Sequence, residues 1–384
     1  MFLRNDLDEL LAFDKRPAVS IYLPTHPAGS EVRQDRIRLR KLLAAAARRL
    51  AAEHRPPEID ALLEPARRLV DDEEFWRYQD QGLGVFLGPG FDRIHRLPIA
   101  VPEELAVADH FSIKPLLPLI DPAGSFWVLA LSASRTRLYH GSRWTFAEVT
   151  GLDVPQGLAE IWGETEYQEA RKASPTGRTL HGSGGLAKAQ AFGETPGELR
   201  KAQLIELLHR IVASLEPVIK RQPAPVILVA EPKLQGHFRE LAKWKELLPD
   251  GILEFADAMA ERDLYRKACA IFAPREERLR TDALGRLQSL LSTGNGKATT
   301  NAEDIVKAAR YGRVDRLFLC DGRPLWGRFD ERQDRVVAHR EPAAGDDDLL
   351  DYAALMTLRQ GGNVTLVDRT RLPPDGPAAA ILRY

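Results

Sequence analysis

The amino-acid sequence predicts an α/β protein of about three domains. Its 384 residues exceed what one small hydrophobic core accommodates and are typical of two or three domains. Hydrophobic residues make up 44% and charged residues 28%, which is ordinary for a globular chain. Helical and strand patterns alternate through the last third of the chain, which is typical of an α/β/α sandwich.

The first predicted domain covers residues 1–118. A β-rich run at 17–24 stops at a proline. A helix is predicted over 32–53, because apolar residues recur there on one face, and a second over 57–78. The apolar run Gly82–Gly88 is predicted to be a buried strand ending in a Pro-Gly turn.

The second predicted domain covers residues 119–256. Alternating residues predict a meander of strands. The expected elements are strands over 126–132, 137–140, 144–149 and 225–230 and helices over 198–220 and 234–248. Between them lies a segment, 163–197, that is rich in Gly, Ser, Thr, Pro and charge and lacks periodicity. Irregular segments of this length are uncommon in compact domains unless they are functional or disordered.

The third predicted domain covers residues 257–384. A long helix is expected to end before Gly294-Asn295-Gly296, and the capping-box pattern at Thr300–Glu303 predicts the start of the next one. Asp346–Asp348 precede a helix predicted over 349–359. Such carboxylates could bind a cation, but at a helix start we expect them to cap it, because they interact favourably with the positive end of the helix dipole. The expected strands cover 316–320, 324–328, 364–368 and 379–384.

Several catalytic signatures are missing from the sequence. The stretch around Gly294–Lys297 lacks the Gly and the Ser or Thr of a phosphate-binding loop, because Leu291 and Ala298 occupy those positions. There is no His-Glu-x-x-His, no Cys-x-x-Cys and no Gly-x-Ser-x-Gly motif. We therefore expect no metal ion, no cofactor and no catalytic residues of these kinds. Cys269 and Cys320 lie in apolar surroundings and are expected to be core thiols in a reducing compartment.

Targeting signals are also missing. The N-terminus has no apolar signal core, and no apolar run approaches the length of a membrane span. A cytoplasmic protein without membrane contact is expected. The net charge of −1 gives no overall basic field, so any contact with nucleic acid has to come from local patches.

One such patch is predicted on the helix over 32–53. Arg33, Arg36 and Arg40 are spaced for one face, opposite the apolar stripe, and Lys41, Arg48 and Arg49 add charge. A solvated surface and an RNA-contacting surface both agree with this pattern.

Three stretches give the chain a resemblance to a known family. They are Trp127–Gly141, the Gly-rich His181–Gly185, and Ala308–Leu319. Leu349–Gly362 followed by Val364–Asp368 fits the same domain as the third stretch. In this order they resemble the bacterial relatives of the archaeo-eukaryotic peptide-chain release factors and of Pelota, over roughly the last two-thirds of the chain. The resemblance implies a central RNase H-like mixed sheet and a C-terminal α/β/α domain of the kink-turn-binding ribosomal-protein type. It also implies the ribosome (rRNA and tRNA) as partner, and a translational GTPase such as elongation factor Tu.

The resemblance also defines what the Gly-rich segment is expected to do. The family's catalytic tripeptide is Gly-Gly-Gln, in which glycines allow close approach to RNA and a polar group assists water. Here Leu186 follows Gly184 and Gly185, so the side-chain donor is lost; Gln190 lies a few residues on. The residues expected to contact RNA here are Arg178, His181, Gly184, Gly185, Lys188 and Gln190.

Three functions stay open at this point. The first is a ribosome-associated factor for rescue, hibernation or stress that does not hydrolyse peptidyl-tRNA. The second is a peptidyl-tRNA or other ester hydrolase that uses the degenerate Gly-Gly loop. The third is a stand-alone RNA-binding protein. A nuclease is not expected, because the first strand of the RNase H-like domain, 126–134, carries no carboxylate for two-metal chemistry.

Overall fold

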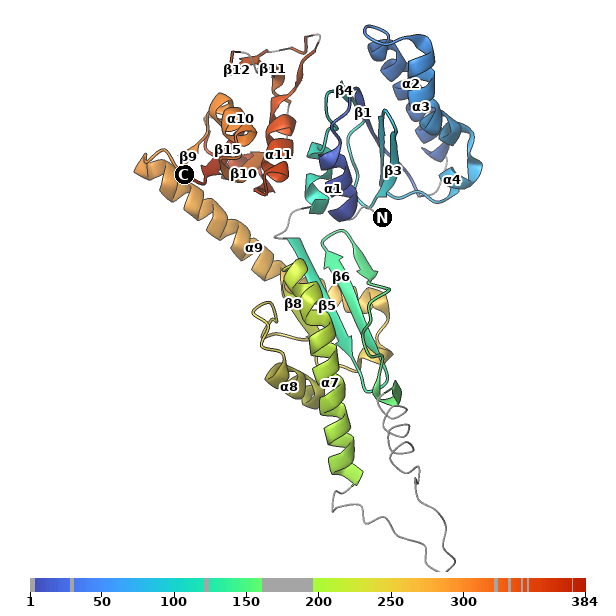
Figure 1. The fold of residues 1–384 in the computed structure, drawn as a ribbon, viewed down its shortest axis with the longest axis vertical. Coiled ribbons are helices and arrows are strands. Elements are labelled where there is room, and N and C mark those ends of the chain that lie inside the picture. Colours follow the sequence, from blue (N-terminus) through green and yellow to red (C-terminus); the bar gives the residue numbers. More distant parts are fainter. Residues whose placement is uncertain are drawn as a thin grey trace, which may run out of the picture. The chain divides into compact units, whose positions relative to one another are not determined.

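The computed structural model describes residues 4–27, 31–120, 124–160, 196–320, 324–330, 333–339, 341–343, 345–374 and 376–384. By its contacts the chain divides into two compact units (Figure 1). Unit 1 combines Met1–Pro122 with Arg278–Tyr384, and unit 2 is Ala123–Glu277. Both units mix helices with sheets, so the predicted α/β class is confirmed. The division into three domains stays a prediction.

An antiparallel sheet of order β3-β2-β1-β4 forms the N-terminal part of unit 1. Its strands are β1 (Ala18–Pro24), β2 (Gly82–Gly88), β3 (Phe91–Leu97) and β4 (Glu104–Ala108). Strand β1 is buried on both faces, and its alternate side chains enter two different cores. Val19, Ile21 and Leu23 pack against α2 (Glu31–Leu50) and α3 (Pro56–Asp71), which lie side by side.

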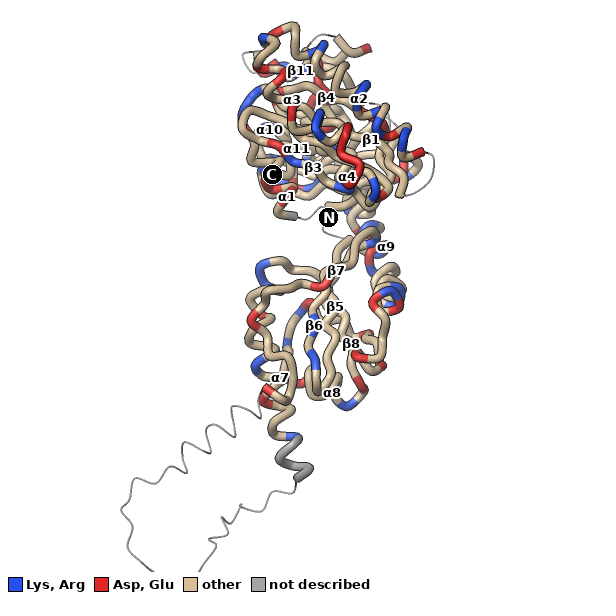
Figure 2. The backbone as a smooth tube through the Cα atoms, turned by 90° about the vertical axis from the view of Figure 1, so that its right-hand side faces the viewer, with Lys and Arg blue, Asp and Glu red and all other residues tan. Residues whose placement is uncertain are grey.

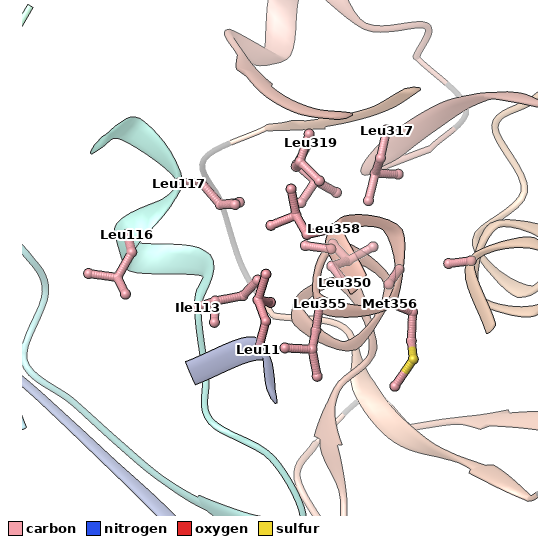
Figure 3. Packing of buried hydrophobic residues seen from close by; sticks show 14 of the residues in the cluster. Leu11, Ile113, Leu116, Leu117, Leu317, Leu319, Leu350, Leu355, Met356 and Leu358 are labelled. Atoms are coloured by element: carbon pink, nitrogen blue, oxygen red, sulfur yellow. The ribbon is translucent and has the colours of Figure 1, made fainter. Parts of the chain in front are cut away.

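The opposite face of this sheet packs against the other end of the chain. Tyr22 and Phe86 belong to the same hydrophobic cluster as α1 (Arg4–Ala12) and as residues of α11 (Leu349–Arg359). Figure 3 shows Leu11, Ile113 and Leu117 turned toward leucines of α11 and of β10 (Val314–Cys320). The N-terminal sheet therefore completes its core with residues more than two hundred positions away.

Helix α11 is the element on which the two parts of unit 1 meet. Nine of its residues are buried, and they lie on all sides of the helix, as expected of a helix inside a core. At its start the Asp348 carboxylate caps the backbone N–H of Leu350 and pairs with Lys114 Nζ at 3.1 Å. One turn on, Asp351 accepts the backbone N–H groups of Ile113 and Lys114 at 2.9 and 2.6 Å.

The last turn of α11 makes a second polar connection to the N-terminal part. The Arg359 guanidinium donates to the carbonyl oxygens of Leu11 and Phe13, at 2.6 and 2.8 Å. Buried carbonyls and N–H groups need such partners, since an unpaired one costs about 1–3 kcal/mol. Both ends of α11 thus fix the N-terminal segment by hydrogen bonds, while its middle fixes it by packing.

The C-terminal sheet of unit 1 has the order β14-β10-β15-β9, with β10 parallel to β14 and antiparallel to β15. Helices line both of its faces: α10 and α11 on one, and the end of α9 on the other, through Leu284 and Leu287. The bounds are α9 Glu261–Thr293, α10 Ala302–Arg310, β9 Ala298–Thr299, β14 Asn363–Val367 and β15 Ala378–Leu382.

Unit 2 is built on a mixed sheet of order β7-β6-β5-β8. Its elements are β5 (Ser125–Leu131), β6 (Thr136–Ser142), β7 (Phe146–Glu148), β8 (Val226–Val229), α7 (Pro196–Arg221) and α8 (Pro232–Leu241). Strand β8 is parallel to β5, whereas β6 is antiparallel to it. Trp127 and Leu129 face α7 and α8, while Phe126 and Val128 face the first half of α9.

Shorter elements complete the described part of the chain. They are α4 (Glu73–Arg77), α5 (Leu117–Ile120), β11 (Trp326–Asp330), β12 (Arg335–Ala338), β13 (Asp347–Asp348) and the 3-10 turns η1 (Lys114–Leu116), η3 (Ala256–Ala258) and η4 (Arg369–Arg371). Strands β12, β11 and β13 form a small antiparallel sheet.

Local sequence signals proved reliable at several helix ends. A helix starts at the predicted Thr300–Glu303 pattern, but its cap is Asn301 instead of Thr300, because the Asn301 side chain accepts the N–H groups of Glu303 and Asp304. Asp348 caps α11, as predicted. Helix α9 ends immediately before Gly294. The helix predicted over 234–248 is too long, since α8 ends at Leu241. Its last predicted turn is extended instead, because the N–H of Leu248 donates to the carbonyl of Val226 in β8.

The α11 connection leads to a first prediction. Asp351→Ala leaves the N–H groups of Ile113 and Lys114 without an acceptor, so we expect unit 1 to lose about 2–4 kcal/mol of unfolding free energy. Asp351→Asn keeps an acceptor oxygen and should stay within about 1 kcal/mol of wild type. Urea unfolding followed by pulsed hydrogen exchange reports each unit separately. An equal loss in both variants would contradict this role of the acceptor.

A second prediction concerns pH. Asp347 lines a cavity of about 340 Å³ with Glu104, Asp348 and Asp351. Burial, reinforced by neighbouring carboxylates, raises the pKa of Asp347 to about 6. Its charged form is therefore disfavoured in the folded state, and this cost is removed as pH falls from about 7 toward the ordinary pKa near 3.8.

Asp347→Asn should accordingly raise the urea midpoint of unit 1 at pH 7.5, and this gain should shrink at pH 4.5. The comparison is made between variant and wild type at each pH, because His110 in the same cavity titrates in the opposite sense. Burial lowers the pKa of His110 to about 4, so its contribution to stability falls as pH falls. A gain of the same size at both pH values would exclude Asp347 as the titrating group.

Candidate RNA-contacting surface

Helix α2 carries the basic surface that the sequence predicts. Its buried side is a regular apolar row against the N-terminal sheet: Leu39, Leu43, Ala46 and Leu50. Because these residues recur at helical spacing, they fix which side of α2 faces solvent. In Figure 2 the lysines and arginines along α2 are drawn in blue.

Asp35 is the one acidic residue on the buried side of α2, and it is 0% exposed. Its carboxylate accepts the backbone N–H of His26 at 2.9 Å and a guanidinium N–H of Arg38 at 3.1 Å. The His26 ring nitrogen Nδ1 lies 3.1 Å from the same carboxylate. Asp35 thus anchors the turn after β1 to α2, and its charge is turned away from the exposed side.

The three arginines predicted on one face of this helix have different surroundings. Arg33 is exposed. The Arg40 side chain is 67% exposed and lies 3.4 Å from the Asp71 carboxylate, which is itself 83% exposed. Arg36 is half-buried, and its Nε–H donates to the carbonyl of Val70 at 3.0 Å. Arg33 and Arg40 are therefore available to a ligand, whereas Arg36 also helps to join α2 to α3.

Four cations form a continuous exposed surface on α2, which we call the basic stripe: Arg33, Arg40, Lys41 and Arg48. Within the described part of the chain, Arg33, Lys41 and Arg48 make no ion pair. Gln34, Ile37 and Ala44 are exposed beside these cations, and none of them is acidic. Glu31 and Arg49 are also exposed but lie farther around the helix, where Arg49 donates to the carbonyl of Leu105 at 2.7 Å.

Three of the four acids of the neighbouring helix α3 pair locally, and only Asp71, its last residue, lies beside a cation of the basic stripe, Arg40. Glu58 binds Arg55, Asp60 binds Arg67, and Glu64 binds Arg68, with N–O distances of 2.5, 2.7 and 2.9 Å. Exposed pairs of this kind contribute little to stability, about 0–1 kcal/mol each, but they do cancel charge. The net positive charge of this side of unit 1 is thus concentrated on α2.

The residues predicted in the Gly-rich loop lie outside the described residues. Arg178, His181, Gly184, Gly185, Lys188 and Gln190 all fall within 161–195. The last two positions of the predicted loop begin helix α7. The predicted RNA contact of these six residues stays a prediction.

Among the described residues there is no group of three or more His, Cys, Asp or Glu side chains arranged to hold a metal ion. Strand β5 itself carries no carboxylate, as its sequence Ser-Phe-Trp-Val-Leu-Ala-Leu shows. None of the helices in the described part is long and apolar enough to span a membrane.

Comparison with known families identifies the class of this protein. Its central segment, residues 125–313, matches a family of release factor type, so the predicted resemblance to the release factors and Pelota is confirmed. The particular family whose model this segment matches is the bacterial archaeo-eukaryotic release factor family 3. The match runs from the first strand of unit 2 through α10.

Solved structures of the same class are similar to the chain. The archaeal translation termination factor aRF1 is 14% identical, with 98% of this chain and 96% of that chain covered and a TM-score of 0.24. Archaeal Pelota, from a model of ribosome-bound Pelota and ABCE1, is 12% identical, with 99% and 94% covered and a TM-score of 0.38. Dom34 of S. cerevisiae is 12% identical, with 79% and 74% covered and a TM-score of 0.34. Among curated protein sequences there is no match.

The sequence prediction assigned only Arg33, Arg36 and Arg40 to RNA contact and treated Lys41, Arg48 and Arg49 as additional charge. Lys41 and Arg48 belong to the exposed face as fully as Arg33 does. Their signal was present in the spacing, since residues seven apart lie nearly above one another on a helix, and both Arg33–Arg40 and Lys41–Arg48 have this spacing. No pattern in the sequence indicates the hydrogen bond from Arg36 to the carbonyl of Val70, because this bond depends on how α3 packs against α2.

The anchoring role of Asp35 gives a third prediction. Asp35→Ala removes the acceptor of the His26 and Arg38 hydrogen bonds, so unit 1 should lose about 1–3 kcal/mol of unfolding free energy. Asp71→Ala, which removes an exposed partner of Arg40, should change it by less than about 0.5 kcal/mol. The same urea experiment measures both. If the two variants are equally stable, the buried carboxylate does not hold the turn.

Proposed function

We propose that this protein is a cytoplasmic, ribosome-associated translation factor that binds ribosomal RNA or tRNA without hydrolysing peptidyl-tRNA. The observation that carries the proposal is the match of residues 125–313 to a family of release factor type. Roles in rescue, hibernation or the stress response all agree with such a factor. The basic stripe of α2 supports the proposal, because local cation patches are what a chain of net charge −1 needs to bind RNA.

The absence of the catalytic side chain supports the non-hydrolytic part of the proposal. In the family's tripeptide the two glycines bring the backbone close to RNA, and the glutamine side chain assists the attacking water. Leu186 follows Gly184 and Gly185 here, and leucine offers neither a donor nor an acceptor. In this proposal the loop with Arg178, His181, Lys188 and Gln190 makes contacts to phosphates rather than supplying chemistry.

The proposed partners follow from the same family. We propose rRNA and tRNA as the RNA partners, and a translational GTPase such as elongation factor Tu as the protein partner. A central RNase H-like domain and a C-terminal domain of the kink-turn-binding ribosomal-protein type are part of the proposal. The mixed sheet of unit 2 and the helix-covered sheet of β10 and β15 agree with these folds.

Sedimentation with ribosomes tests the proposal. Lysates from growing, stationary and stressed cells are separated on sucrose gradients, and the chain is followed by antibody. We expect it in ribosomal fractions under at least one condition. Its absence from these fractions under all three would refute ribosome association and favour the stand-alone RNA-binding protein.

Release of labelled peptide from stalled ribosome complexes distinguishes the two functions, a non-hydrolytic factor and a peptidyl-tRNA hydrolase. We expect no release above the level of a chain that carries Gly184→Ala and Gly185→Ala. Release that depends on these two glycines would instead support the hydrolase with a degenerate loop.

A further inference from the structure

The geometry of the basic stripe points to a particular kind of RNA. The stripe is part of a regular helix, so the backbone positions from which its cationic side chains extend are fixed along one straight axis. From Arg33 to Arg48 the helix rises about 22 Å, at 1.5 Å per residue. A rigid rod of this length suits a rigid ligand, and this inference rests on the proposed function, which supplies RNA as the ligand class.

Two rows of cations run along the exposed face. Arg33 and Arg40 form one row and Lys41 and Arg48 the other, each with members about 10.5 Å apart along the axis. At about 100° per residue, the two rows are separated by roughly 80° around the helix. Ile37 and Ala44 lie between them, and Ile37 is 42% exposed. The face is therefore an uncharged ridge with a row of cations on either side.

Such a face matches the minor groove of double-stranded RNA. That groove is wide and shallow and is bordered by a phosphate backbone on each side, with 2′-hydroxyl groups on its floor. A helix about 10–12 Å across with its side chains would place the ridge toward the sugars and one row of cations on each backbone. Alanine at position 44 allows the helix to approach closely, and Ile37 can contact the sugar edge.

Single-stranded RNA is a poorer match. Proteins that bind it stack successive bases on aromatic rings, to which arginine adds a cation–π contribution. The stripe supplies guanidinium groups but not the rings. The exposed face of α2 holds no aromatic side chain among Arg33, Gln34, Ile37, Arg40, Lys41, Ala44 and Arg48. Cationic groups on long side chains contact phosphates, and such contacts do not distinguish one base from another.

We propose that the basic stripe of α2 is a binding site for double-stranded RNA, with Arg33 and Arg40 on one phosphate backbone and Lys41 and Arg48 on the other. Binding depends on the shape of the duplex and is independent of its sequence. Within a ribosome, the corresponding target is a helical segment of rRNA.

Fluorescence anisotropy with the full chain tests this site. The probes are a labelled RNA duplex of about 20 base pairs, the matching single strand, and vesicles of anionic lipid. We expect the chain to bind the duplex more tightly than the single strand. Arg33→Gln, Lys41→Gln and Arg48→Gln should each weaken duplex binding by a factor of roughly 3–10 and reduce the salt slope by about one.

Two further variants control this experiment. Arg68→Gln removes the same charge from α3, where it pairs with Glu64, and should leave duplex affinity and salt slope unchanged within about twofold. Ala44→Glu puts an acid on the exposed ridge at a position where helix stability changes little, and should abolish duplex binding. Equal effects of Arg68→Gln and Lys41→Gln would overturn the site. So would tighter binding of the single strand, or stripe-dependent binding to vesicles alone.

Failure of this binding site can be distinguished from failure of the proposed function. A triple variant combines Arg33→Gln, Lys41→Gln and Arg48→Gln. If wild type and this variant sediment equally with ribosomes and bind duplex equally, the site is wrong and ribosome association stands. If the stripe binds duplex but the chain is absent from every ribosomal fraction, the site stands and the proposed function fails.

Discussion

The hydrogen bonds of Asp351 with Ile113 and Lys114 hold unit 1 together. They join residues 238 and 237 positions apart, at the point where α11 enters the core shared with the N-terminal sheet. Removing a carboxylate from water is unfavourable, and here burial raises the pKa of Asp351 well above its ordinary value. Two backbone N–H groups offset part of that cost. The position of the N-terminal sheet, and with it the direction in which α2 faces, depends on this arrangement.

Helix α2 shows how packing creates a functional surface without a dedicated loop. Leu39 and Leu43 bury one side of the helix, and Asp35 pairs inside the protein with Arg38 and His26. Because the only inward acid is neutralised internally, the outward side keeps its positive charge. Three acids of α3, Glu58, Asp60 and Glu64, are likewise paired with nearby arginines, and only Asp71 lies beside the stripe, at Arg40. The positive surface thus arises from where the negative charges are placed as much as from where the arginines are.

The sequence predicts those features that depend on neighbours along the chain. Buried strands such as β2, the long helices and the start of α10 follow from periodicity and local hydrogen bonding. Strands β3 and β4 were missed, because their partly exposed residues show no clear alternation. The end of α8 at Leu241 depends on residue 248 pairing with β8, and the contact of α11 with η1 spans most of the chain. The exposed residues of α2 were predictable from their spacing, whereas the hydrogen bond from Arg36 to the carbonyl of Val70 was not.

The discontinuous composition of unit 1 has a consequence for synthesis of the protein. During translation, β1 and β2 leave the ribosome long before α11 does. At about 5–20 residues per second, the 238 positions between Ile113 and Asp351 take roughly 12–48 s to make. During that time the face of the sheet that carries Tyr22 and Phe86 lacks its final covering. The nascent chain thus exposes an apolar surface until α11 has been made, and such surfaces make unfinished domains prone to aggregation.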